Sequence, residues 1–384
     1  MDNKRTVKEQ ENVKEQENAK EQDTMKEQEN VKEQENAKEQ DTMKGRENAK
    51  EQDSMKEQEN AREQDTMKTQ NMEERPGAAE ERIVMRHVSK YYGKKQALKD
   101  VSLTIDKGMF GLLGRNGAGK TTLMKILATL HGKQSGSVTV CGIPIEEAKA
   151  VREIIGYLPQ DFSMYPSMTV REALDYLGVL SEMPKAKRRE RIDSLLKKVH
   201  LSDERHKKIR SLSGGMKRRL GIAQALLHDP RVLIVDEPTA GLDPEERIRF
   251  RNLLCEVAEE RIVILSTHIV GDIEAACENL AILNEGEILW QGTLDEILLN
   301  AAGKVWRAEI SGGELARVKK KYIVTGMLKQ GNHMTVRFLS EAPPDIAGAV
   351  QDEANCEDAY LYCLYQSGCE VMGGEAAGGE ESCF

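Results

Sequence analysis

The spacing of hydrophobic residues along the chain changes at Ile83. From there to about Leu299, short β-rich apolar runs alternate with stretches of helical periodicity. Two of these runs, "VLIV" at 232–235 and "IVIL" at 262–265, are apolar throughout and have the length of a strand. The alternation predicts an α/β fold with a largely parallel central sheet.

Residues 8–67 form a tandem repeat with a different spacing. The unit "KEQENVKEQENAKEQDTM" occupies 8–25 and 26–43, and shortened copies follow. A six-residue step turns a helix by roughly 600°, so successive apolar positions fall about 120° apart. No apolar stripe forms, so neither a coiled-coil seam nor a face that packs on a core is available. We expect a solvated helix or a disordered segment.

These changes in pattern predict five segments. Pro76-Gly77 marks a linker, residues after 303 give mixed strand and helix signals, and the end of the chain is rich in Gly and Glu. The predicted segments are a repeat tail (1–75), a linker (76–81), the main α/β domain (82–303), a small accessory α/β domain (304–365) and a flexible tail (366–384).

Charge and composition narrow the range of partners. The net charge is −9, of which the repeat tail contributes −7, from 15 Lys and Arg against 22 Asp and Glu. The remainder is nearly balanced, which does not suggest nucleic acid as a partner. The longest apolar runs are too short to cross a bilayer, so any work at a membrane needs another chain for the spanning part. The seven cysteines lack metal-ligand spacing, and we expect reduced thiols in a cytoplasmic protein.

The stretch "GLLGRNGAGKTTLMKIL" has the P-loop pattern in its required place, after a strand-like run and at the start of a helix. Its glycines let backbone amides close on phosphates, Lys120 adds positive charge at the β and γ oxygens, and the Thr121 hydroxyl suits Mg²⁺. The predicted ATP-binding residues of this loop are Gly114, Arg115, Asn116, Gly117, Ala118, Gly119, Lys120, Thr121 and Thr122.

Three further elements carry polar residues to the same edge of the predicted sheet. The strand "VLIV" delivers Asp236 to hold Mg²⁺ and Glu237 to polarise a water molecule, although an acidic pair can also simply end a buried strand. The strand "IVIL" ends near His268, which suits the γ-phosphate or the attacking water, or has only a structural role. Gln160 in "LPQD" suits Mg²⁺ or that water, although the same residues also form an ordinary turn.

A second glycine pair, in "LSGGMKRRLGIAQAL", opens an amphipathic helix. Because four elements already surround one nucleotide, we infer that Ser213, Gly214 and Gly215 serve a nucleotide on a second copy of the domain, across a two-fold interface. Additional positive charge at the start of this helix is expected from Lys217, Arg218 and Arg219. The alternative is a helix that is simply started by Ser-Gly-Gly.

Together these motifs, in this order, resemble the ATP-binding subunits of ABC transporters over about residues 82–300. The matching stretches are an aromatic residue in "KYYGK", Walker A "GRNGAGKTT", Q-loop "LPQD", signature "LSGGM", Walker B "VLIVDE", D-loop "AGLD" and H-loop "STH". Within this family, the chain is most similar to the bacterial exporter-type branch, in the stretches "YPSMTVREAL", "STHIVGDIE" and "CEDAYLYCL".

The resemblance implies a P-loop NTPase fold of the ABC ATPase type, with core α/β, antiparallel β and helical subdomains. It implies that Tyr92 stacks on adenine, that Thr122 reaches the α-phosphate, that Glu237 is the catalytic base and that Asp243 links two sites across a dimer. It also implies ATP and Mg²⁺ as ligands and a second ATP-binding subunit, most simply an identical one. A separate integral-membrane permease would hold the protein at the inner face of the cell membrane.

Other classes of ATPase explain fewer of the motifs. A DNA-repair ATPase of this kind needs a long coiled-coil insert between Walker A and the signature, and a ribosome-linked factor has two cassettes in one chain. A small-molecule kinase or GTPase leaves the signature and the H-loop unexplained. A soluble ABC-type ATPase, for example in cofactor assembly, remains the alternative to an exporter subunit.

Overall fold

The computed structural model describes residues 81–331 and 333–369, and this stretch belongs to one compact unit. The predicted repeat tail, most of the predicted linker and Cys383 lie outside the described residues. The strands are β1 (Arg82–Tyr92), β2 (Lys95–Asp106), β3 (Gly108–Leu113), β4 (Ser135–Val140), β5 (Ile143–Pro144), β6 (Ile155–Leu158), β7 (Val232–Asp236), β8 (Ile262–Thr267), β9 (Asn279–Asn284), β10 (Glu287–Thr293), β11 (Val305–Ser311), β12 (Ile323–Gln330), β13 (His333–Leu339) and β14 (Val350–Gln351).

Several helices begin directly after a residue whose side chain caps the first turn. They are α2 (Lys120–Leu127), α3 (Ala148–Ile154), α4 (Val170–Leu180), α5 (Lys185–Lys198), α6 (Gly214–Ala225), α7 (Pro244–Ala258), α8 (Val270–Glu274), α9 (Leu294–Ala301), α10 (Leu315–Lys321) and α11 (Cys356–Gln366). Thr169, Ser213, Asp243 and Thr293 accept a backbone N–H of the first turn and so fix the start of α4, α6, α7 and α9.

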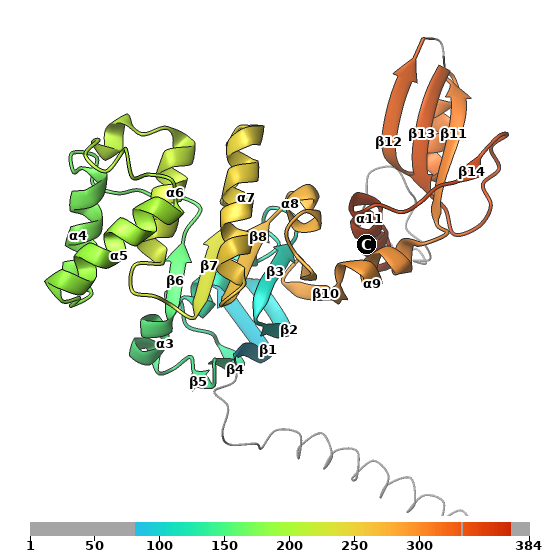
Figure 1. Cartoon of the computed structure of the whole chain (residues 1–384). Coiled ribbons are helices and arrows are strands. Elements are labelled where there is room, and N and C mark those ends of the chain that lie inside the picture. Colours follow the sequence, from blue (N-terminus) through green and yellow to red (C-terminus); the bar gives the residue numbers. More distant parts are fainter. Residues whose placement is uncertain (1–80, 332, 370–384) are drawn as a thin grey trace, which may run out of the picture. The chain divides into compact units, whose positions relative to one another are not determined.

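A six-stranded sheet in the order β10-β9-β3-β8-β7-β6 forms the centre (Figure 1). The pairs β6·β7, β7·β8, β8·β3 and β3·β9 are parallel, and only β10 joins antiparallel. The prediction of a largely parallel α/β sheet is therefore confirmed. The carboxyl ends of β3, β7 and β8 lie at one edge, and the P-loop, Glu237 and His268 follow these ends.

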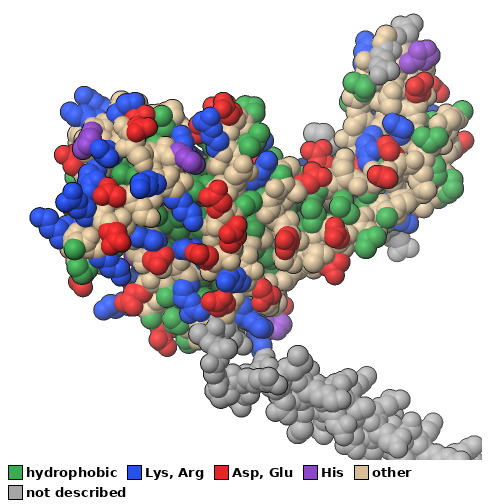
Figure 2. All heavy atoms as spheres, in the orientation of Figure 1, with side chains coloured by type: hydrophobic (Ala, Val, Ile, Leu, Met, Phe, Trp, Pro, Cys, Tyr) green, Lys and Arg blue, Asp and Glu red, His purple; other side chains and the backbone are tan. Residues whose placement is uncertain are grey.

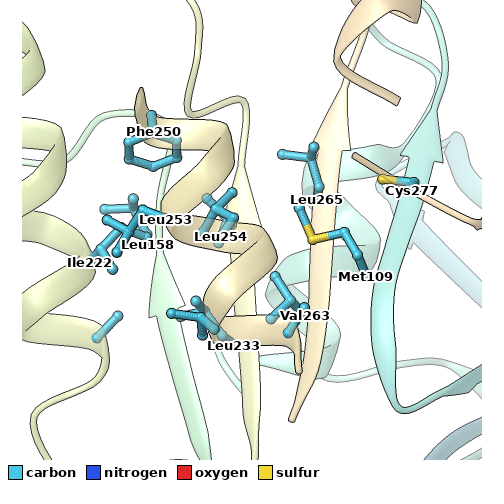
Figure 3. Close-up of a cluster of buried hydrophobic side chains, with 14 of the residues drawn as sticks. Met109, Leu158, Ile222, Leu233, Phe250, Leu253, Leu254, Val263, Leu265 and Cys277 are labelled. Carbon is cyan, nitrogen blue, oxygen red and sulfur yellow. The ribbon is translucent and has the colours of Figure 1, made fainter. Parts of the chain in front are cut away.

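Both faces of this sheet are buried, which explains why its strands are apolar without interruption. Along β7, Leu233 and Val235 point into one hydrophobic cluster, whereas Val232 and Ile234 point into the other. The first cluster also holds Leu158 of β6, Ile222 of α6 and Leu253 of α7, which meet beside the sheet (Figure 3). The sheet and the two helices are thus packed as one body.

A four-stranded antiparallel sheet, β2-β1-β4-β5, packs its apolar residues into the second cluster, together with α2. Tyr92 ends β1, and the turn to β2 consists of Gly93 and Lys94. On the other side, α4 and α5 pack with α6 around buried leucines. The basic run at the start of α5 is largely exposed, and Figure 2 shows Lys and Arg side chains over this part of the surface.

The region after residue 303 forms a second antiparallel sheet, β12-β13-β11-β14, with α10 on it. Its last helix, α11, packs on α8, α9 and β10 of the main domain as well as on β12 of its own sheet. Ala359, Tyr362 and Cys363 of α11 share a hydrophobic cluster with Ile297 and Ala301 of α9. Residues 304–365 are therefore joined to the main domain by a common core.

Within residues 81–331 and 333–369, every helix is too short or too polar to span a bilayer. No group of His, Cys, Asp and Glu there has the arrangement of a metal site, and the six described cysteines are unpaired.

Candidate functional site

An open cavity of about 680 Å³ lies at the carboxyl edge of the central sheet. It brings together residues from four separate predicted motifs, namely the aromatic stretch, Walker A, the Q-loop and Walker B. Its lining is Tyr92, Lys95, Gln96, Ala97, Lys99, Asn116, Gly117, Gly119, Lys120, Thr121, Thr122, Gln160, Glu237 and Glu285. The cavity is large enough for a nucleotide.

The P-loop wraps around the start of α2. Gly119 caps this helix with φ at 110°, a backbone angle that favours glycine, and a Cβ there would lie 2.6 Å from the carbonyl oxygen of Ala97. Lys120 follows as the first helical residue, and its Nζ donates to the carbonyl oxygens of Gly114 at 2.7 Å and Arg115 at 3.2 Å. The loop therefore holds the lysine amine inside its own curve.

Lys120, Glu237 and His268 form a continuous chain of polar contacts. Lys120 Nζ lies 3.1 Å from Glu237 Oε1, and both side chains are buried, with exposures of 5% and 6%. The other oxygen, Oε2, lies 2.5 Å from His268 Nδ1. Both oxygens of Glu237 are thus engaged.

The backbone at Glu237 is strained, with φ at 49°, and its N–H donates to the carbonyl oxygen of Ser266 at 2.9 Å. A left-handed residue at a strand end turns the side chain away from the sheet direction. This geometry lets Glu237 face the cavity while its neighbour Asp236 stays in the core. Strained backbone of this kind is concentrated at functional sites.

Asp236 is fully buried, with no exposed surface, and neither carboxylate oxygen has a hydrogen-bond partner among the described residues. Burial raises the pKa of this carboxyl. The hydroxyls of Ser266 and Thr121 lie beside it and lower that pKa, because they favour the ionised form. A buried carboxylate with two unused oxygens next to a threonine hydroxyl fits a Mg²⁺ ion, which prefers hard oxygen ligands.

The rim of the cavity carries Tyr92 and Gln160. Tyr92 is 44% exposed and meets His131 edge to face, with ring centroids 5.9 Å apart. Lys90 Nζ lies over the same ring, 5.3 Å from its centroid. Gln160 is exposed, and its backbone carbonyl accepts from Arg218 Nη1 at 2.5 Å, which ties this loop to α6.

The signature residues lie outside the cavity lining. Ser213 caps α6, its Oγ accepting from the N–H of Met216 at 3.2 Å, and both Ser213 and Gly214 are exposed. Asp243 caps α7 in the same way, accepting from the N–H of Glu246 at 2.9 Å, and is exposed as well. Two exposed helix starts therefore stand apart from the cavity that holds the P-loop.

Arg218 and Arg219 were expected to add positive charge at the start of α6, but their side chains mostly interact with other groups of this chain. Arg219 is buried and forms an ion pair with Glu246, and Arg218 donates to the carbonyl of Gln160. The expectation of an amphipathic helix also needs correction, because α6 is buried over most of its circumference by its neighbouring helices and β6. Sequence periodicity cannot reveal neighbours that cover the polar side too.

Among the predicted site residues, Gly114, Arg115 and Ala118 do not line the cavity. Gly114 and Arg115 hold the Lys120 amine with their carbonyls, and Ala118 is buried. Two further predicted residues do not line the cavity but adjoin Glu237: His268 contacts its carboxylate, and Asp236 precedes it in the chain. The sequence analysis missed Lys95, Lys99 and Glu285, although the basic run "KYYGKK" beside Tyr92 was a visible signal.

The comparisons with known proteins agree with this architecture. A family model described as "ABC transporter" matches residues 98–240. A solved structure of cbiO1 from Clostridium perfringens, part of the complex cbiONQ, superposes with a TM-score of 0.53 and 28% identity, covering 61% of this chain and 92% of that one. A dimeric structure of MJ0796, a bacterial ABC transporter cassette, gives a TM-score of 0.51 and 28% identity over 55% of this chain and 98% of that one.

Curated relatives extend the similarity. The uncharacterized ABC transporter ATP-binding protein YxlF of Bacillus subtilis is 43% identical over 209 residues, covering 54% of this chain and 70% of the relative. The linearmycin resistance ATP-binding protein LnrL of the same species is 37% identical over 221 residues, 56% of this chain and 71% of the relative. Nod factor export ATP-binding protein I of Cupriavidus metallidurans is 32% identical over 289 residues, 72% of this chain and 95% of the relative. By its motifs, its fold and these relatives, the chain belongs to the ATP-binding proteins of ABC transporters.

Proposed function

We propose that two copies of this chain enclose two ATP molecules, hydrolyse them and thereby drive a separate membrane permease, in the direction of export. In this arrangement each ATP is held by the P-loop cavity of one copy and by the Ser213–Gly215 turn of the other. The chain then works at the cytoplasmic face of the membrane, attached through the permease.

The observation that carries the proposal is the division of the motifs between two surfaces. The cavity collects the P-loop, Gln160, Glu237 and Tyr92, whereas Ser213, Gly214 and Asp243 are exposed elsewhere, at the starts of α6 and α7. A helix start with free amides suits a phosphate. Because the cavity lining lacks that helix start, a second copy is the natural source of one. The dimeric MJ0796 cassette is a precedent for two such chains meeting.

The contacts in the cavity suggest how the reaction begins. Without nucleotide, Lys120 neutralises Glu237, and His268 engages the second oxygen. The β and γ oxygens of ATP compete for Lys120, so binding frees Glu237 Oε1 to accept a proton from the attacking water. His268 then holds Glu237 through Oε2 and fixes its orientation.

Thr121, Asp236 and Gln160 would hold Mg²⁺. When bound, the ion offsets charge on the phosphates. Tyr92 stacks on the adenine ring, and Thr122 at the start of α2 donates toward the α-phosphate. The amides of Asn116 to Lys120 surround the remaining phosphate oxygens. Each of these roles belongs to one copy, so two complete sites require two copies.

Export is the direction that the relatives favour, since one is named for Nod factor export and another for linearmycin resistance. Closure and reopening of the dimer would pass to the permease through the segment 164–170, which follows Gln160 and leads into α4.

Mixed dimers test the shared site. One differently tagged copy carries Lys120→Ala, the other Ser213→Arg, and the mixed species is isolated by sequential affinity steps. The Lys120→Ala copy cannot bind ATP normally in its own cavity. The Ser213→Arg copy cannot supply the Ser213–Gly215 turn to that same cavity, so both defects fall on one composite site. The other site stays intact, and we expect about half the wild-type ATPase rate.

The control is a dimer with both substitutions on one copy, which places one defect in each site. We expect this species to be nearly inactive. Equal rates for the two arrangements contradict a site shared between copies. Separately, if a membrane protein is encoded beside this chain, we expect the two to co-purify after co-expression, with an ATPase rate that depends on the membrane subunit; absence of such a complex favours a soluble ATPase.

A further inference from the structure

The starts of α6 and α7 carry the two residues expected to face a second copy, Ser213 and Asp243. Glu246 lies in the first turn of α7, and its N–H is the one that Asp243 caps. Its side chain leaves α7 and reaches the first turn of α6. Glu246 thus connects the two helix starts.

The contact between Glu246 and Gly215 is close. A Cβ at Gly215 would lie 2.3 Å from Glu246 Oε2, 2.7 Å from Cδ and 2.9 Å from Cγ. At Gly214, in contrast, an added Cβ meets nothing within 4 Å. A side chain at Gly215 would therefore displace the Glu246 carboxylate, whereas one at Gly214 would displace no neighbour.

Charge reinforces this contact. Glu246 Oε1 lies 3.4 Å from Nη2 of Arg219 and 3.2 Å from Nη1 of Arg249. The Arg219 side chain is 7% exposed and that of Glu246 is 16% exposed. A pair this well buried is screened little by solvent, and loss of one member leaves the other charge without compensation. Oε2, the atom nearest Gly215, has no hydrogen-bond partner among the described residues, so it adds negative charge at the positive end of α6.

We propose that Glu246 is a positioning residue: packed on Gly215 and paired with Arg219, it fixes the first turn of α6 against the first turn of α7, so that Ser213 and Asp243 meet a second copy as one rigid surface. The bodies of the two helices are already held by their shared apolar core, in which Ile222 and Leu253 meet (Figure 3). Leu212, Met216 and Leu242 pack on the same core beside the two helix starts, and the Glu246 contacts link one first turn to the other.

The physical need for such a residue follows from the glycine pair. Two consecutive glycines give the first turn of α6 more backbone freedom than any other dipeptide. A turn that samples many conformations must be ordered when it closes on a phosphate, and this ordering weakens association. Glu246 orders the turn in advance.

This inference rests on the proposed function, because it concerns the surface that closes on ATP. The test uses the full chain with Glu237→Gln as the parent, in which slow hydrolysis keeps an ATP-bound dimer long enough to measure. Sedimentation velocity gives the dimer dissociation constant in saturating Mg-ATP, and a fluorescent ATP analogue gives the affinity of the monomer at low protein concentration.

We expect Glu246→Ala to weaken dimerisation about tenfold while it changes the monomer affinity for the ATP analogue less than about twofold. Glu246→Gln keeps the contact on Gly215 and the hydrogen-bonding shape, and we expect it to recover dimerisation to within about threefold of the parent. The matched control is Glu245→Ala: Glu245 is the neighbouring residue and also pairs with Arg249, but it is 75% exposed and does not touch Gly215. This control should dimerise like the parent.

Each outcome has a separate meaning. If Glu246→Ala dimerises like the parent, or if Glu245→Ala weakens dimerisation as much, the assignment of Glu246 is overturned. If monomer affinity and dimerisation fall together and Glu246→Gln restores neither, Glu246 supports folding and does not position the turn. If the parent itself forms no dimer with ATP, the proposed function fails, and this result is visible before any Glu246 variant is made.

Discussion

Asp236→Asn is expected to stabilise the nucleotide-free protein while it abolishes the effect of Mg²⁺. In the folded chain the Asp236 carboxylate has no exposed surface and neither oxygen has a hydrogen-bond partner among the described residues. Asparagine has the same shape without the charge, and its amide can donate to the hydroxyl of Ser266, which also has no hydrogen-bond partner in the described part of the chain.

The magnitude follows from the missing partners. A buried polar group without a hydrogen bond costs about 1–3 kcal/mol, and a charged one costs more. Relief of that cost raises the free energy of unfolding by about 2 kcal/mol. For a domain of this size each kcal/mol moves Tm by about 2–4 °C, so we expect a gain of about 5 °C.

The gain depends on pH in a defined direction. Burial raises the pKa of Asp236, so the folded state disfavours the ionised form. The wild-type protein therefore loses stability relative to Asp236→Asn as pH rises from the unfolded carboxyl pKa, about 3.9, through the raised folded value. The difference in Tm widens across that window and is constant above it.

Thermal unfolding by calorimetry, with and without Mg²⁺ and ATP, measures both effects. Asp272→Asn is the matched control, since Asp272 is equally buried but accepts from Thr239 Oγ1 at 2.5 Å and lies 3.7 Å from Arg247. We expect this control to lower Tm. Ligand at 100 times its Kd stabilises by about 2.7 kcal/mol, and the Mg²⁺-dependent part of that shift should vanish in Asp236→Asn. A lower Tm for Asp236→Asn without nucleotide refutes the reasoning.

Three other substitutions probe the cavity. Glu237→Gln should bind ATP normally, hydrolyse it at least about 100-fold more slowly and elute as a dimer with ATP on size exclusion; rapid phosphate release would remove Glu237 as the base. Tyr92→Ala should weaken ATP binding about tenfold through lost stacking, as measured by calorimetry, whereas the neighbouring Tyr91→Ala, outside the cavity lining, should not. Gly114→Ala should destabilise the fold by about 1–3 kcal/mol, because its Cβ would lie 2.2 Å from the carbonyl oxygen of Leu283, while Gly271→Ala, where a Cβ meets nothing within 4 Å, should leave Tm nearly unchanged.

Sequence analysis correctly predicted the location of residues that belong to contiguous motifs. The P-loop needs only its own glycines, Lys120 and the start of α2, and the structure brings these together in the cavity. The strands "VLIV" and "IVIL" were predicted because each is apolar throughout, and they are β7 and β8 of the central sheet. Such local features depend only on residues that are adjacent in the sequence.

The residues that the sequence placed poorly depend on partners far along the chain. Arg219 was expected to add field at the start of α6, but it is buried against Glu246, which lies 27 residues further on. Lys95 and Lys99 of β2 reach the cavity only because the antiparallel sheet packs beside the P-loop. The packing of α11 on α8 and α9 gave no signal either.

The sequence by itself determined the α/β class, the family and the identity of the nucleotide loop, since periodicity and motif spacing are properties of adjacent residues. Only the tertiary structure decided that Glu237 lies between Lys120 and His268, that Asp236 is left without partners, and that Glu246 packs on Gly215. These contacts join separate elements whose distances are set by how the sheets and helices pack, and packing depends on the shapes of all their side chains together.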